Sequence, residues 1–71
     1  MTLDLHNVKH EDVTRKIDEF LWLAMQNGES NVKIITGNSI VMRNIVLKCL
    51  EEHGLSPSPF FNQFSVIFVD L

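Results

Sequence analysis

The spacing of apolar residues along the chain changes from one segment to the next and marks two kinds of element. Between His10 and Asn27, apolar residues recur three or four positions apart, which is the period of one helix face. This stripe consists of Val13, Ile17, Phe20, Leu21 and Ala24. A second stripe between Ile40 and His53 consists of Met42, Val46, Cys49 and Leu50. The pattern predicts two amphipathic helices, each followed by a glycine that suits a helix end.

Three further segments have the pattern of β-strands. Thr2–His6 alternates between apolar and polar residues, and Asn31–Thr36 is rich in β-branched residues. Ser65–Asp70 is a nearly continuous apolar run, which predicts a strand buried on both faces. A short extra strand is expected near Phe60–Asn62. The order β-α-β-α-β, with or without this extra strand, indicates an α/β two-layer sandwich with two helices on a mixed sheet.

Length and composition restrict this fold to one small domain over residues 1–71. The net charge of −3 argues against a strongly basic nucleic-acid surface and against tight binding by counterion release. No apolar run approaches the roughly 20 residues of a transmembrane helix, so we expect no membrane contact. There is also no secretory signal pattern at the N-terminus. The single Cys49 excludes an internal disulfide, and this cysteine usage fits the reducing cytoplasm.

Candidate chemistry lies in two polar clusters, each at the end of a predicted strand. Asp4 and His6 are two residues apart on one strand, so they project to the same face. A carboxylate beside an imidazole fixes its tautomer and raises its basicity, which suits a general base or acid. A polar pair that only bonds a neighbouring loop is the structural alternative.

The second cluster, Thr36-Gly37-Asn38-Ser39, opens the second predicted helix with Ser39 as its N-cap. Backbone amides and the helix dipole there favour an anion, and Arg43, one turn further, can bind a phosphate with two hydrogen bonds. An ordinary strand-to-helix turn is the alternative. Ligands of open α/β sheets bind beyond the carboxyl ends of the strands, so we expect both clusters at one sheet edge. Asp70, at the end of the last predicted strand, is a further candidate for positioning a metal ion or water.

Together, the two clusters resemble the motifs of the Smr (small MutS-related) domain family. Leu3-Asp4-Leu5-His6 is similar to its first motif, L-D-L-H-G, and Ile34-Ile35-Thr36-Gly37 to its second, H/T-G-x-G ahead of a Leu-Arg pair. The resemblance extends over nearly the whole chain. It implies an α/β sandwich and, as in many family members, metal-dependent or metal-assisted nicking or endonuclease activity on DNA or RNA. It assigns Asp4 and His6 to catalysis and matches Arg43 to the arginine of the Leu-Arg pair.

The chain departs from these motifs at several positions. Asn7, a residue that tolerates left-handed backbone, stands where the family has glycine. Asn38-Ser39 replaces the x-G step, and Lys9 stands where a helix-capping hydroxyl is usual. The candidate nucleic-acid-binding residues of this chain are Asn7, Lys9, Thr36, Gly37, Asn38, Ser39 and Arg43.

These departures leave the function open between two readings. One is a nuclease with weakened motifs, using a divalent metal ion (Mg²⁺ or Mn²⁺, with unknown ligands) or no cofactor. The other is a non-catalytic module that binds nucleic acid, because fewer glycines leave fewer amides to surround a phosphate.

A surplus of large apolar residues supports a third interpretation, a domain that dimerises or binds a partner protein. The residues concerned are Trp22, Leu23, Met25, Phe60 and Phe61. The first three widen the apolar face of the first predicted helix, so we expect that helix to be covered on more than one side.

Overall fold

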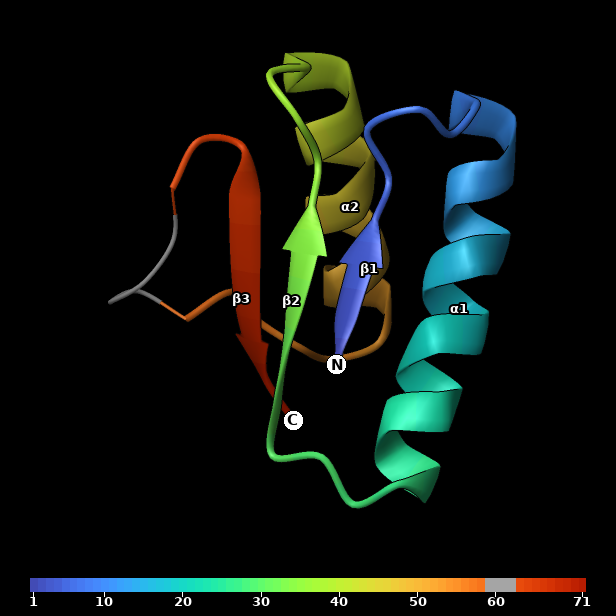
Figure 1. The fold of residues 1–71 in the computed structure, drawn as a ribbon, viewed down its shortest axis with the longest axis vertical. Helices are drawn as coiled ribbons and strands as arrows, with labels where there is room; N and C mark the ends of the chain where they lie inside the picture. The colour runs from blue at the N-terminus through green and yellow to red at the C-terminus, as the bar shows by residue number, and fades with distance from the viewer. Residues whose placement is uncertain (59–62) are drawn as a thin grey trace.

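A computed structural model describes residues 1–58 and 63–71, and it confirms the predicted order of elements (Figure 1). The elements are β1 (Thr2–Asp4), α1 (His10–Gln26), β2 (Asn31–Ile35), α2 (Ile40–Glu52) and β3 (Val66–Asp70). The sheet order is β1-β2-β3, with β1 parallel and β3 antiparallel to β2, so the sheet is mixed as predicted. The extra strand expected near Phe60–Asn62 lies outside the described residues. No helix in the described part of the chain is long and apolar enough to cross a membrane.

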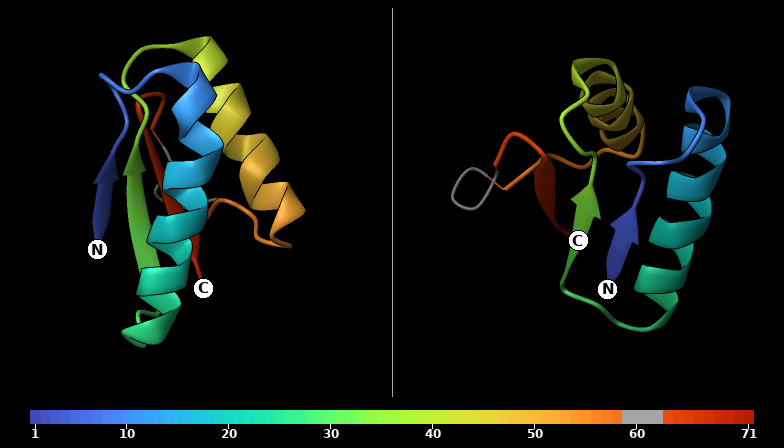
Figure 2. Two further views of the ribbon diagram at one scale, coloured as in Figure 1. Left: turned by 90° about the vertical axis from the view of Figure 1, so that its right-hand side faces the viewer. Right: turned by 45° about the horizontal axis from the view of Figure 1, so that its top comes forward.

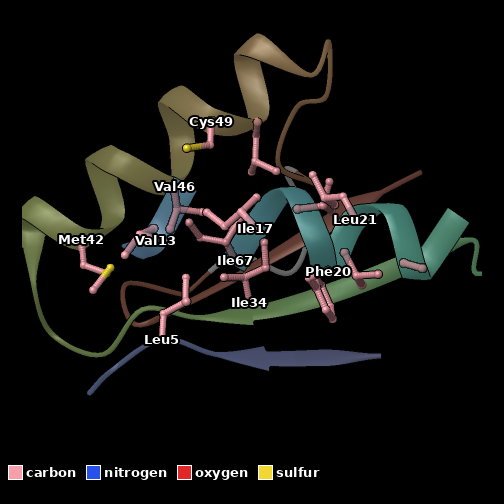
Figure 3. Packing of buried hydrophobic residues seen from close by; sticks show 14 residues of the cluster. Leu5, Val13, Ile17, Phe20, Leu21, Ile34, Met42, Val46, Cys49 and Ile67 are labelled. Atoms are coloured by element: carbon pink, nitrogen blue, oxygen red, sulfur yellow. The ribbon is translucent and has the colours of Figure 1, made fainter. Parts of the chain in front are cut away.

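Both helices pack on the same face of the sheet, which gives two layers (Figure 2). The predicted stripes of α1 and α2 are the buried faces of these helices. They meet the buried side chains of the sheet and of the residue after β1 in one core, shown in Figure 3. The sheet side of this core consists of Leu5, Val32, Ile34, Ile67 and Val69.

Two expectations about burial are wrong, for one reason. β3 alternates, with Ile67 and Val69 buried and its other apolar side chains half-buried, because both helices lie on one side of the sheet. Likewise, the described residues cover α1 on one side only. Trp22, Leu23 and Met25 are 62%, 47% and 51% exposed. A strand or helix in a chain with two layers has only one covered face.

The parallel pairing of β1 and β2 determines where the candidate site lies. Asp4 pairs with Ile35, so the two strands end level and both following loops leave the sheet at the same edge (top of Figure 1). Because β3 is antiparallel, the segment before it also lies at this edge. There the Ser65 carbonyl accepts hydrogen bonds from the amides of Thr36 (2.8 Å) and Gly37 (3.2 Å). The prediction that both polar clusters open at one edge is therefore confirmed.

Candidate active site at the carboxyl edge of the sheet

Asp4 and His6 form a hydrogen-bonded pair at the end of β1. The imidazole Nδ1 lies 2.6 Å from Oδ1 of Asp4, and the same oxygen accepts the backbone N–H of His6 at 3.0 Å. A tight turn produces this geometry, because the Val8 amide donates to the Leu5 carbonyl at 3.0 Å and bends the chain back. Both side chains are about half exposed, at 51% and 53%, so a ligand in solution can reach them.

The charge of Asp4 determines which imidazole nitrogen carries the proton. The side-chain hydrogen bond from His6 lowers the pKa of the Asp4 carboxyl below its usual 3.8, and the backbone hydrogen bond from His6 lowers it further. Asp4 is therefore ionised at neutral pH and can only accept. In the neutral imidazole Nδ1 must then be the donor, which leaves Nε2 with its lone pair available as an acceptor.

Asn7 contacts that second nitrogen. Its Nδ2 lies 3.0 Å from Nε2 of His6, and since Nε2 is an acceptor, the carboxamide donates this hydrogen bond. No non-glycine residue among those described has a positive φ, so Asn7 does not use the left-handed backbone that asparagine tolerates. The turn does not need the special backbone freedom of asparagine or glycine at this position.

Gly37, in the loop after β2, packs directly against His6. Its φ is +69°, and a Cβ built on it would lie 3.1 Å from the Cβ of His6. The preceding Thr36 is 1% exposed, and its hydroxyl donates to the Gly37 carbonyl at 3.2 Å. The hydrogen bond from the buried Thr36 thus helps to hold Gly37 in place. Because the amides of both residues donate to Ser65, they do not face a ligand.

The donors open to an anion lie slightly further along, in the first turn of α2. Ser39 caps this helix as predicted, with its Oγ accepting the Met42 amide at 3.1 Å. The amides of Ile40 and Val41 bond no acceptor in the described part of the chain. Sequence reasoning did not name this pair, although the first amides after the predicted N-cap Ser39 have no acceptor within the helix. Asn38 is exposed beside them.

Two cations lie near this edge. Nη1 of Arg43 donates to the carbonyls of Gln63 and Phe64, each at 3.1 Å, so this side chain ties α2 to the segment before β3. No carboxylate of residues 1–58 and 63–71 pairs with Arg43, so its charge is not neutralised there. Lys9 is the exposed N-cap residue of α1 and makes no side-chain capping bond.

Asp70 does not belong to this site. It pairs with Asn31, the first residue of β2, so it lies at the opposite end of the sheet from Asp4. The expectation that Asp70 positions a metal ion or water next to the two clusters is wrong. The reason is the antiparallel direction of β3, which the sequence pattern does not specify.

The donor set of the site does not fit a metal ion held by protein ligands. The described residues contain no group of three or more His, Cys, Asp or Glu side chains that could hold one. Asp4 is the carboxylate beside the imidazole, and its Oδ1 already accepts two hydrogen bonds from His6.

Comparison with known proteins adds one finding. The family model described as Smr domain matches residues 3–64, a range that includes both loops of the site. No curated protein and no solved structure matches the chain.

Proposed function

Because the chain belongs to the Smr domain family, we propose that it processes nucleic acid by cleaving a phosphodiester bond of DNA or RNA at the carboxyl edge of the sheet. Family membership points to a nucleic-acid-related function. Support for cleavage comes from a single observation, the Asp4–His6 pair held against Gly37 of the neighbouring loop. The pair supplies a proton acceptor. The neighbouring loop leads from Gly37 in three residues, at most about 11 Å of chain, to Ile40, whose amide is the first free donor of α2.

In the proposed reaction, Nε2 of His6 is the general base. It accepts the proton of the attacking hydroxyl, either a ribose 2′-OH or a water molecule, while that oxygen bonds to phosphorus. The bond from phosphorus to the leaving oxygen breaks, and the leaving oxygen takes a proton from solvent. Asp4 keeps Nδ1 protonated and stabilises the imidazolium that forms, as the carboxylate of a catalytic triad does.

The phosphate would bind at the start of α2. The amides of Ile40 and Val41 and the positive end of the helix dipole favour an anion there, and Arg43 adds a charge one turn away. Phe64, 51% exposed and bonded through its carbonyl to Arg43, is available to stack on a base. Because residues 1–58 and 63–71 place two cations near the edge, Lys9 and Arg43, we expect weak binding that depends little on salt.

A cleavage panel tests this function. Wild type and His6→Ala are incubated with labelled single-stranded, duplex and branched DNA and RNA. The matched control is His10→Ala, which removes another exposed imidazole four residues away. We expect His6→Ala to lose about 100-fold or more in rate, the usual contribution of general acid–base catalysis. His10→Ala should cleave like wild type, and all three should have the same circular dichroism spectrum. Equal cleavage by His6→Ala would contradict the assignment.

A binding module without catalysis is the second candidate, and the hydrogen bond from Asn7 to the base nitrogen favours it. In this case gel shifts would show a complex, with no product after long incubation with Mg²⁺ or Mn²⁺.

The third candidate function is the binding of a second copy or a partner protein on α1, favoured by the exposed Trp22, Leu23 and Met25. Sedimentation that shows a strict monomer at high concentration would contradict dimerisation.

A further inference from the structure

The nitrogen that the proposed reaction needs is already hydrogen-bonded within the protein. Nε2 of His6 accepts from the Asn7 carboxamide at 3.0 Å, while Nδ1 is held by Asp4 at 2.6 Å. A neutral imidazole nitrogen has one lone pair, in the plane of the ring, and that lone pair accepts one well-aligned hydrogen bond. A substrate hydroxyl and Asn7 must therefore compete for the same position.

The turn that carries Asn7 does not depend on this side-chain hydrogen bond. The turn is closed by the backbone bond from Val8 to Leu5, and Asn7 is exposed with an ordinary negative φ. Substituting Asn7 should therefore leave the backbone in place. The other groups around the imidazole are Asp4 at the end of β1 and Gly37 on the loop after β2, and the described residues place no second charged partner on His6.

We propose that Asn7 inhibits the site by occupying Nε2 of His6, and that nucleic acid must displace its carboxamide before His6 can accept a proton. The proposal rests on the proposed function for its catalytic consequence, but the hydrogen bond itself can be tested without any substrate.

The substrate-free test uses diethylpyrocarbonate, which transfers an ethoxycarbonyl group to an imidazole nitrogen and releases ethanol and carbon dioxide. The rate of modification at each histidine is measured by mass spectrometry, with His10 and His53 as internal references. In Asn7→Ala we expect His6 to react about fivefold faster, the factor that corresponds to one net hydrogen bond. Asn44→Ala, which removes an exposed asparagine from α2, is the matched control and should leave the rate at His6 unchanged.

Asn7→Leu separates the hydrogen bond from simple shielding, because leucine keeps the bulk of asparagine but has no donor. If the bond is responsible, His6 reacts faster in Asn7→Leu as well as in Asn7→Ala. A rate that rises only in Asn7→Ala would assign the effect to bulk and overturn the proposal. Unchanged rates in both variants would overturn it too.

Cleavage assays then test the catalytic consequence. We expect kcat/KM of Asn7→Ala to rise by the same factor as the modification rate, because a larger fraction of the imidazole is free. Faster modification with slower cleavage would mean that Asn7 positions the ring productively, which contradicts inhibition. Faster modification with no cleavage by wild type or any variant would support the hydrogen bond at Nε2 and overturn the proposed nuclease function instead.

Discussion

Replacing Gly37 by alanine tests whether the two loops of the site are in contact. Gly37 has a φ of +69°, and the added Cβ would lie 3.1 Å from the Cβ of His6. Gly28 provides a matched control, since its φ is +70° and nothing lies within 4 Å of a Cβ built there. The two substitutions therefore impose the same backbone strain and differ in the contact with His6.

The expected magnitudes follow from these two terms. Left-handed backbone destabilises an L-residue by about 1–2 kcal/mol. Replacing glycine by alanine also lowers the conformational entropy of the unfolded chain, which stabilises the folded state by about 0.4–1 kcal/mol. Gly28→Ala should thus lower the free energy of unfolding by about 1 kcal/mol. Gly37→Ala should lower it by about 1 kcal/mol more, the lower end of the usual cost of overpacking. The Cβ of His6 cannot swing away, because the backbone N–H of His6 donates to Asp4 and the preceding amide donates to Ile35.

Urea unfolding followed by far-ultraviolet circular dichroism measures these differences. A domain of this size is stable by about 4–10 kcal/mol, so both variants should remain folded. The contact is isolated by a double-mutant cycle. His6→Ala keeps the atom that alanine at position 37 would meet, so the extra cost should persist in that background. His6→Gly removes that atom, and the extra cost should disappear. Equal losses for Gly28→Ala and Gly37→Ala, or an extra cost that survives His6→Gly, would refute the contact.

Three further measurements test the site and its support. Because the folded-state pKa of Asp4 is lowered, the stability from its pair with His6 is complete above pH 3.8 and is lost as the pH falls through the lower folded-state value. The urea midpoints of wild type and Asp4→Asn should therefore converge in acid, and a constant difference would contradict the pairing. Ser39→Ala should cost about 1 kcal/mol through loss of the α2 cap, whereas the exposed Ser56→Ala should cost almost nothing. The logarithm of the affinity for single-stranded nucleic acid should fall with the logarithm of salt concentration with a slope of about −1.4, for two phosphates neutralised, and a slope several times steeper would place the interface elsewhere.

The fold was largely predictable because its signals are local. The helix stripes around Ile17 and Val46 depend only on periodicity, and both proved to be the buried faces. The wrong expectations concern how each helix or strand is packed against the rest of the chain, which its own sequence does not determine. The apolar run of β3 does not indicate whether a second helical layer exists, and it does not indicate the direction of the strand. The exposure of Trp22 and the position of Asp70 depend on those two facts.

The candidate site was predictable to a similar extent. The spacing of Asp4 and His6 was enough to predict their pairing, although β1 ends at Asp4, before the predicted strand end at His6, and a turn sets their contact. Parallel strands were enough to bring Gly37 beside them. The bond from Asn7 to the ring depends on a turn that folds a side chain back on its neighbour. The bonds from Arg43 to the carbonyls of Gln63 and Phe64 join segments 20 and 21 residues apart. No local pattern carries such information.

The two chain ends both lie at the edge of the sheet opposite the imidazole (Figure 1). The Met1 carbonyl accepts from the Lys33 amide, and the Leu71 amide donates to Ser30 beside the start of β2. An affinity tag, a fluorophore or a surface tether fused to either end would therefore point away from bound nucleic acid. Immobilised protein should retain the affinity measured in free solution, whichever terminus is attached.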